Sequence, residues 1–292
     1  MKVLFITLLL IVALFSLEAQ TKRALVVGIG NYPVESGWTK IHGDNDVPLI
    51  ANALGQKGFI SNNIRCLANE NATKKNIIKS LNQMIKEAKL NDFLYIHFST
   101  HGQQVVDVDG DEEDGLDEAV IPYDARKTFE KGVYEGKNHL LDDELNHYLT
   151  SLRSKIGKTG SLLVVIDACH SGDATRGEDS TPNDSIVVRG TSEIFQAVAK
   201  KSYSPHIHKP LEWVVISASQ SYQNNFEYRL NDQYFGSLSY AVKLALSDLS
   251  GKEDFVDFFN QMKIKREVMN VARYPQRPMI EGDNLYKNQK IF

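Results

Sequence analysis

The sequence predicts an α/β fold, in which helices flank both faces of a mostly parallel β-sheet to form a three-layer αβα sandwich. Short, buried-looking apolar runs alternate with segments of helical spacing, the pattern of parallel strands joined by helical crossovers. Two of the runs, Asp92–Ser99 and Leu162–Ile166, lead into turns that carry His101 and Cys169. In open α/β sheets the carboxyl ends of the strands form the edge where sites assemble.

The overall composition is that of an ordinary globular protein, compatible with one large α/β domain or two smaller ones. The chain has 292 residues, of which 42% are hydrophobic and 24% charged, with a formal net charge of −4. The charge is mildly acidic and the lysines are scattered, so the sequence indicates no nucleic-acid partner.

Residues 1–20 differ in character from the rest. A basic start, an apolar run from Val3 to Leu17 and a polar stretch ending at Gln20 are typical of a secretory signal. The alternative is a retained membrane anchor, although the run is short for a bilayer span of about 20 residues. Lys22 begins the first strand almost at once, which favours cleavage, and we expect a secreted or periplasmic protein with no stable membrane insertion afterwards.

The amino-terminal half begins with a buried strand, Arg23–Ile29, and a turn. A helix is predicted from near Asp46 to Gly58, with Pro48 in its first turn, followed by a strand over Asn63–Leu67. The next helix, Lys74–Lys89, has Thr73 as its cap and apolar residues at helical spacing.

The carboxyl-terminal half repeats the alternation. After the His101 strand come an acidic loop, a strand at Ala119–Ile121 and a helix opened by three acidic residues, which suits the positive end of the helix dipole. Residues 173–210 are rich in polar residues and are predicted to be a long mobile loop. The last predicted elements are a strand over Glu212–Ser217 and helices over Gly236–Leu249 and Glu253–Ala272.

His101 and Cys169 are the candidate catalytic pair, because an imidazole that accepts a thiol proton makes the sulfur nucleophilic. Residues two apart on a strand share a face, so Ser99 should point with His101, and Asp167 with Cys169. Gly102 has no Cβ, so its N–H can approach an oxyanion, and the N–H of Cys169 can be the second donor.

Other residues compete weakly for these roles. His170 is a rival base, but it points away from its neighbour Cys169 on extended backbone. The remaining histidines are expected to be surface or packing residues: His42, His97, His139, His147, His206 and His208. Cys66 is expected to be a small buried hydrophobe and not the disulfide partner of Cys169.

The acidic loop from Asp107 to Glu118 has oxygen ligands that suit a hard cation. It is not an EF-hand, because Glu112 stands where that loop requires glycine. The alternative is a solvated charged loop.

Four motifs together resemble the metacaspases, which are caspase-like cysteine peptidases. They are the Ser-Thr-His-Gly strand end at Ser99, the run Asp-Gly-Leu-Asp-Glu-Ala-Val-Ile-Pro at Asp114, the run Leu-Asp-Asp-Glu-Leu at Leu141, and Asp-Ala-Cys-His-Ser-Gly at Asp167. The resemblance covers about residues 22–245. It implies one caspase-like peptidase domain over 21–292, with a large-subunit-like region (21–172), a linker (173–210) and a small-subunit-like region (211–292).

The resemblance also implies chemistry: cleavage after Arg or Lys, with Cys169 as nucleophile and His101 as base. It implies a substrate pocket lined by Asp46, Ser99 and Asp167. It further implies calcium as a possible activator, with these matching ligand positions: Asp117, Asp142, Asp143 and Asp173.

The sequence departs from its relatives in places. The stretch Ile41–Asp46 matches the family's Gly-Cys-x-Asn-Asp motif only loosely. The assignment of Asp46 to the substrate pocket therefore has a weaker motif match behind it than the assignments of Ser99 and Asp167. The caspase signature Gln-Ala-Cys is replaced by one with Asp167, and a carboxylate there favours basic substrates. The alternative role for Asp167 is to accept backbone hydrogen bonds at the strand end.

The sequence therefore predicts a monomeric cysteine endopeptidase that acts on peptides or proteins with basic residues and cuts itself within 173–210. One alternative is a catalytically silent caspase-like binding domain, which would have no need of both His101 and Cys169. Another is a thiol hydrolase of a different kind, which would act on small esters or amides.

Overall fold

The structure is a computed structural model that describes residues 20–107, 110, 112, 114–169, 187–196, 211–220, 223–269 and 276–292. The predicted signal segment lies outside this part of the chain except for Gln20. Among the described residues, no helix combines the length and the apolar composition needed to cross a bilayer.

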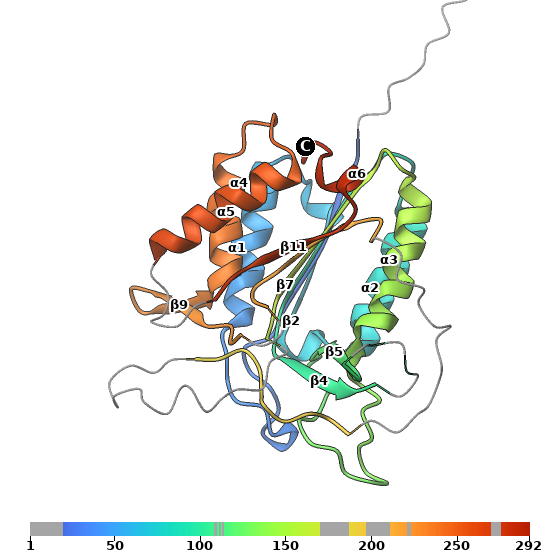
Figure 1. The fold of residues 1–292 in the computed structure, drawn as a ribbon, viewed down its shortest axis with the longest axis vertical. Coiled ribbons are helices and arrows are strands. Elements are labelled where there is room, and N and C mark those ends of the chain that lie inside the picture. The colour runs from blue at the N-terminus through green and yellow to red at the C-terminus, as the bar shows by residue number, and fades with distance from the viewer. Residues whose placement is uncertain are drawn as a thin grey trace, which may run out of the picture.

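The centre of the molecule is a six-stranded sheet in the order β11-β8-β7-β3-β1-β2, parallel except for β11 at one edge (Figure 1). Its strands are β1 (Lys22–Gly28), β2 (Ile64–Ala68), β3 (Phe93–Ser99), β7 (Ser161–Asp167), β8 (Val214–Ser217) and β11 (Met279–Glu281). A second sheet contains β4 (Gly102–Val106), β5 (Leu116–Val120) and β6 (Leu140–Leu141), and β9 (Glu227–Leu230) pairs with β10 (Gln233–Gly236).

Helices cover both faces of the large sheet, as predicted (Figure 1). One face carries α1 (Gly43–Gln56), α4 (Ser237–Asp248) and α5 (Phe255–Met269), the other α2 (Lys74–Glu87) and α3 (Asp142–Ile156), while α6 (Asn284–Lys287) lies near the carboxyl terminus. Alternation along β1 divides its side chains between two apolar cores, with Leu25 and Val27 in one and Ala24 and Val26 in the other. The predicted three-layer fold is confirmed.

A local sequence signal explains the start of α2, whereas packing explains the start of α1. Thr73 caps α2 by accepting a hydrogen bond from the Asn76 N–H at 3.3 Å. Helix α1 begins at Gly43, earlier than predicted, so Pro48 lies in its second turn instead of its first. The reason is packing: a Cβ at Gly43 would lie 2.1 Å from the Ser99 carbonyl oxygen, so only glycine lets the helix end dock against β3.

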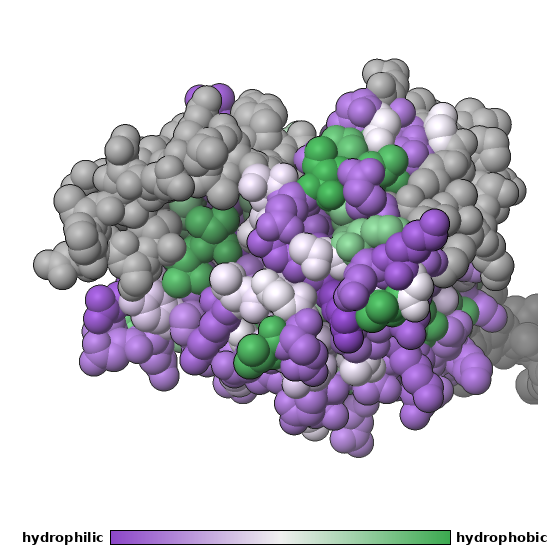
Figure 2. All heavy atoms as spheres, turned by 90° about the horizontal axis from the view of Figure 1, so that it is seen from below, coloured by the Kyte–Doolittle hydropathy of each residue, from purple (hydrophilic) through white to green (hydrophobic). Residues whose placement is uncertain are grey.

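The register of the central strands sets up one edge of the sheet. Ser99 at the end of β3 pairs with Asp167 at the end of β7, so the residues that follow them, including His101 and Cys169, leave the sheet side by side. Seen from this end, the described surface is mostly hydrophilic, with apolar residues in small separate groups (Figure 2).

Candidate active site

His101 lies just beyond β3, fully buried among aromatic rings. Its ring stacks on that of Trp38 with 4.8 Å between centroids, and its centroid lies 5.3 Å from that of Tyr32. Nε2 lies 2.9 Å from the carbonyl oxygen of Thr39, so this nitrogen carries the proton and donates it. Nδ1 is buried without a hydrogen-bond partner, which leaves its lone pair available to accept a proton.

Cys169 lies two residues beyond the end of β7 and is also fully buried. Its thiol donates to the carbonyl oxygen of Gln223 at 3.1 Å, so the sulfur keeps its proton in this arrangement. Cys169 and Cys66 are both free, which confirms that they do not pair. The expectation that Cys66 is buried is wrong: it is exposed on the edge strand β2, where the sheet has no further neighbour.

The predicted oxyanion donors converge on one oxygen. The N–H of Cys169 donates to the carbonyl oxygen of Arg189 at 2.8 Å, and the N–H of Gly102 donates to the same oxygen at 3.4 Å. The next residue, Gly190, lies against Cys169, because a Cβ built on it would lie 2.9 Å from the Cys169 Cβ. The Arg189–Gly190 peptide bond therefore lies against Cys169, with the Arg189 carbonyl oxygen held by two backbone amides.

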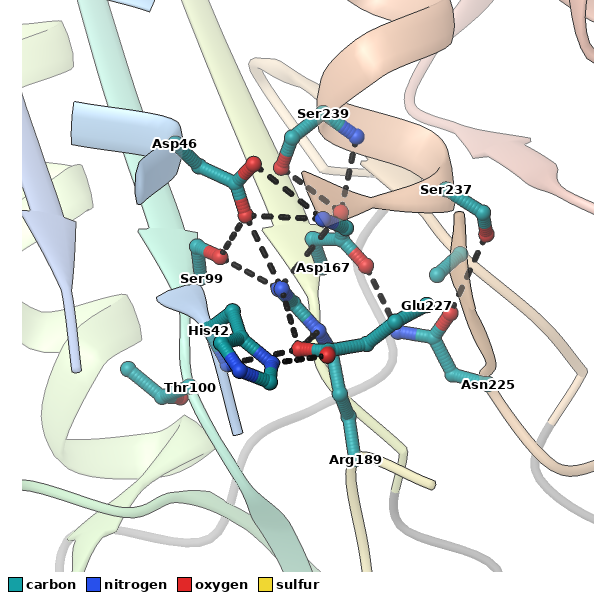
Figure 3. A network of polar contacts seen from close by, with 12 residues as sticks. His42, Asp46, Ser99, Thr100, Asp167, Arg189, Asn225, Glu227, Ser237 and Ser239 are labelled. Carbon is teal, nitrogen blue, oxygen red and sulfur yellow. Dashed lines mark hydrogen bonds and ion pairs between the residues drawn. The ribbon is translucent and has the colours of Figure 1, made fainter. Parts of the chain in front are cut away.

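The side chain of Arg189 fills the predicted substrate pocket (Figure 3). Its Nη2 donates to Asp46 Oδ2 at 3.0 Å, and its Nη1 donates to the Ser99 hydroxyl and lies 3.8 Å from Asp167 Oδ2. The guanidinium is completely buried, as are the two carboxylates. The structure thus brings Asp46, Ser99 and Asp167 together around one guanidinium.

Glu227 is a third carboxylate of this pocket that the sequence analysis missed. Its Oε1 accepts from Arg189 Nη2 at 2.9 Å and from Nε at 3.1 Å. Its Oε2 lies 2.6 Å from Nδ1 of His42, which stacks on Tyr234. His42 is therefore part of the pocket wall. Glu227 lies at the start of a short strand far from the motifs, and no local pattern distinguishes it.

The back of the pocket is formed by hydrogen bonds that orient Asp167. Its Oδ1 accepts from the Asn225 amide at 2.6 Å, and its Oδ2 accepts from the backbone and hydroxyl of Ser239 at 2.7 and 2.6 Å. A Cβ on Gly236 would lie 2.1 Å from Asp167 Oδ2, so only glycine allows α4 to start this close to the pocket. Asp167 therefore faces Arg189 and also accepts a backbone hydrogen bond, while its role in substrate binding stays a prediction.

The pKa values of the buried groups are shifted in different directions. Burial raises the pKa of Asp46 to about 7, although Arg189 opposes this shift. Burial also acts against the charge of Asp167, but Arg189 and the bonds from Ser239 and Asn225 leave its pKa below the ordinary value. Burial lowers the pKa of His101 to about 4, so its ring is neutral at physiological pH.

The residues before Arg189 bind as an added strand. The N–H of Arg189 donates to the Asn225 carbonyl at 3.0 Å, and the N–H of Glu227 donates to the Val187 carbonyl at 3.1 Å. Val188 forms an antiparallel bridge with Phe226. This is the arrangement in which proteins recognise an extended peptide, by hydrogen bonds to its backbone and pockets for its side chains.

We call residues 187–196 the inserted segment. Mobility was predicted for the whole of 173–210, but within the inserted segment Arg189 is fully buried, Phe195 is only 2% exposed and Thr191 is also buried. The rest of that range lies outside the described residues, as do His170, His206 and His208. The signal available in the sequence was three β-branched residues before Arg-Gly, Ile186, Val187 and Val188, which form an apolar run inside a polar stretch.

The acidic residues proposed for calcium are placed only in part. Asp142 Oδ1 is buried without a hydrogen-bond partner, and burial followed by repulsion from Asp143 and Asp117 raises its pKa well above the ordinary value. Within the described residues, however, no three His, Cys, Asp or Glu side chains are arranged to hold a metal ion. Asp173 lies outside the described residues.

The remaining histidines mostly have the packing or surface roles that were expected. His97 is buried between the hydroxyls of Tyr95 and Ser239, and His139 is buried beside Tyr134, while His147 is exposed.

Comparison with known proteins identifies the family of the chain. The family described as "Metacaspase, peptidase C14 domain" matches residues 22–176. Metacaspase-1A of Aspergillus fumigatus is 28% identical over 301 aligned residues, covering 89% of this chain and 68% of the relative. Metacaspase-1A of Aspergillus clavatus is 34% identical over 301 residues, covering 89% and 65%.

A solved structure shares the fold. The crystal structure of a structural-genomics target from Geobacter sulfurreducens superposes with a TM-score of 0.61 at 20% sequence identity, covering 92% of this chain and 97% of that one. At this identity the likeness concerns the fold alone. The family match covers more than half of the sequence, and the chain therefore belongs to the metacaspases, a family of cysteine peptidases that act on peptide or protein substrates.

Proposed function

We propose that this protein is an endopeptidase that cuts after arginine, with Cys169 as nucleophile and His101 as general base. One observation carries the proposal. The chain's own Arg189–Gly190 peptide bond lies against Cys169. The Arg189 carbonyl oxygen accepts hydrogen bonds from two backbone amides, and the Arg189 guanidinium forms ion pairs with the pocket carboxylates. A peptide substrate bound for cleavage needs the same three contacts.

The reaction follows from this placement. The thiol turns from the Gln223 carbonyl and gives its proton to Nδ1 of His101, and the sulfur attacks the carbonyl carbon before the cut. The oxyanion is held by the N–H groups of Gly102 and Cys169. The C–N bond breaks as His101 returns the proton to the leaving amine. A water molecule then attacks the thioester while giving a proton to His101, which passes it to the departing sulfur.

The pocket supports a preference for arginine over lysine. Arg189 donates from Nε, Nη1 and Nη2 to three different acceptors, on Glu227, Ser99 and Asp46. A lysine ammonium is a point donor and cannot reach all of these acceptors at once. Aspartate should be rejected, because an unpaired carboxylate among buried carboxylates is strongly unfavourable.

Self-cleavage is part of the same proposal, and its bond is Arg189–Gly190. Incubated wild-type protein should yield a fragment ending at Arg189 and another beginning Gly-Thr-Ser-Glu. Cys169→Ala should stay whole, and His101→Ala should cut at least about 100-fold more slowly. Arg189→Gln should remove this cut, whereas Arg229→Gln, which changes an exposed arginine, should leave it in place.

The decisive experiment combines this assay with peptides that differ only in the residue before the cut. Arg should be best, Lys next and Asp uncleaved. N-terminal sequencing that places the cut elsewhere would contradict the assigned bond. Equal fragmentation of wild type and Cys169→Ala would point to a contaminating protease. Efficient cleavage after Asp would overturn the pocket assignment.

We also propose calcium as an activator through Asp117, Asp142, Asp143 and Asp173. The support is Oδ1 of Asp142, which is buried without a hydrogen-bond partner close to other carboxylates. A bound cation would supply the missing partner and offset the repulsion between the negative charges. The described acids are not a ready-made site, so binding would have to draw them together. Chelated, metal-free protein that cuts at the rate of calcium-loaded protein would remove this proposal.

The place of action is proposed to be outside the cytoplasm, on the strength of the signal-like residues 1–20. The protein is proposed to act there as a monomer. Mass spectrometry of the exported protein would test the first point by its new amino terminus, and sedimentation would test the second.

A further inference from the structure

The most complete arrangement outside the reacting bond involves Phe195, the sixth residue after the proposed cut. This side chain is 2% exposed, although it belongs to a polar stretch of the sequence. Its ring lies 4.3 Å from the His139 ring and 5.9 Å from each of the Phe129 and Tyr134 rings, measured between centroids. The inserted segment is therefore anchored at two points, Arg189 in the pocket and Phe195 among aromatic rings.

The backbone between the two anchors follows β4, the edge strand of the smaller sheet. The N–H of Phe195 donates to the Gln104 carbonyl at 2.8 Å, and the N–H of Val106 donates to the Phe195 carbonyl at 2.9 Å. Phe195 thereby forms a parallel bridge with Val105. Strand β4 begins at Gly102, whose N–H holds the Arg189 carbonyl, so one strand serves both the reacting bond and the distal anchor.

A buried side chain on β4 also holds the segment. The Gln103 amide nitrogen donates to the Glu193 carbonyl at 2.8 Å, and its Oε1 lies 2.9 Å from Nε2 of His139. Nδ1 of His139 lies 3.0 Å from the Tyr134 hydroxyl, which can donate to it. This chain of partners fixes the orientation of the Gln103 amide, so that its NH₂ group faces the segment.

The pocket wall is shaped for a ring. Gly136 has φ +87°, and a Cβ there would lie 2.8 Å from Cε1 of Phe195. Any larger residue would occupy the space of the aromatic side chain. By comparison, the ion pair between Lys127 and Glu193, at 2.8 Å, is half exposed on the glutamate side and contributes little. The aromatic contact is therefore the dominant distal interaction.

We infer that the pocket formed by Phe129, Tyr134, Gly136 and His139 is a subsite of the peptidase, and that it takes an aromatic side chain six residues after the cut. This inference rests on the proposed function. The chain's own Phe195 occupies the subsite before self-cleavage, and a substrate with the same spacing would occupy it afterwards. The substrate class is then a peptide with arginine before the cut and an aromatic residue at the sixth position after it.

The test in trans uses self-cleaved wild-type enzyme and two decapeptides. One has the sequence of residues 187–196, and the other replaces its phenylalanine by alanine. Burial of a phenylalanine side chain should lower KM for the first peptide at least about ten-fold with little change in kcat. Replacing the isoleucine equivalent to Ile194, which is 43% exposed, should change KM less than about two-fold. Phe129→Ala in the enzyme should shrink the difference between the first two peptides.

The test in cis compares rates of self-cleavage. Phe195→Ala should be at least about ten-fold slower than wild type, Phe195→Leu intermediate, and Ile194→Ala close to wild type. A purely structural role for Phe195 could slow the cis reaction but would not make a free peptide's phenylalanine matter. Equal KM for the two decapeptides overturns the subsite even if Phe195→Ala fails to fold. Absence of any cleavage, in cis or of either peptide, would instead contradict the proposed function.

Discussion

At the scale of single residues, two carboxylates that contact the same guanidinium differ in their pKa values. Burial raises the pKa of Asp46 to about 7 against the opposing effect of Arg189, so its negative charge is the less firmly held of the two. Asp167 is held ionised by Arg189 and by hydrogen bonds from Ser239 and Asn225, which leave its pKa below the ordinary value. The permanent counter-charge of Arg189 is therefore Asp167 more than Asp46.

The first prediction follows from this contrast and is measured in the Cys169→Ala background, where the chain stays uncut. Asp167→Asn should lower the free energy of unfolding by about 3 kcal/mol, because it removes the charged partner of a buried ion. Asp46→Asn, the matched control, should lower it by less than half as much at pH 7. Denaturant titration gives both values. A larger loss for Asp46→Asn would contradict the assignment of charge.

The second prediction concerns the pH dependence of His101. Burial lowers its pKa to about 4, and the nearby Arg189 charge contributes to the lowering. A base must be neutral, so self-cleavage should fall only as pH approaches about 4. Once the inserted segment leaves, water and the lost charge should return the pKa toward about 6.5. The acid limb of peptide kcat/KM should therefore lie at higher pH than that of self-cleavage. Coincident limbs in parallel rate measurements would refute this.

At the scale of elements, the inserted segment pairs with a different stretch of backbone on each side of the proposed cut. Before the cut, Val187 and Arg189 pair with residues 225–227, and after it Phe195 pairs with β4. Between these pairings the backbone passes closest to Cys169 at Gly190, where a Cβ would lie 2.4 Å from the Cys169 carbonyl oxygen. Glycine is the residue that allows this approach.

The third prediction tests that approach. Gly190→Ala should slow self-cleavage at least about ten-fold, because the added methyl group displaces the reacting carbonyl, and small misplacements have large kinetic effects. Ser192→Ala, which changes an exposed residue of the same segment, should cut at the wild-type rate. The rate at which the fragment beginning at residue 190 appears on gels measures self-cleavage of both variants. Wild-type kinetics for Gly190→Ala would show that the segment does not react in the position seen here.

Sequence patterns predicted most elements because those elements depend on local signals, such as the Thr73 cap and the apolar run of β3. The placement of Ser99, Asp167 and Cys169 was also predictable, since strand periodicity and parallel order bring strand ends together. Glu227 could not be predicted, because its role depends on a contact with Arg189 across 38 residues of chain. Local polarity likewise predicted mobility for Arg189 and Phe195, which long-range contacts bury.

At the scale of the whole molecule, one chain supplies both the site and its occupant. The inserted segment covers Cys169, and the negative charge of the pocket is balanced by the segment's own Arg189, which pairs with Asp46, Asp167 and Glu227. A substrate arginine can enter only when Arg189 leaves. On the proposed function, the uncut protein is closed to other peptides until cleavage of the Arg189–Gly190 bond separates Arg189 from the rest of the segment.

The last prediction uses the two cysteines as reporters of this closure. In uncut protein, Cys66 is exposed and Cys169 fully buried beneath Gly190, so an iodoacetamide probe should label Cys66 alone. After self-cleavage Cys169 should be labelled as well, and faster than Cys66, because a thiol beside an imidazole reacts as thiolate. Peptide mass mapping at successive times distinguishes the two sites. His101→Ala, which stays largely uncut, should keep Cys169 protected over the same period while Cys66 reacts normally. Rapid labelling of Cys169 in uncut wild-type protein would mean that the segment does not close the site in solution.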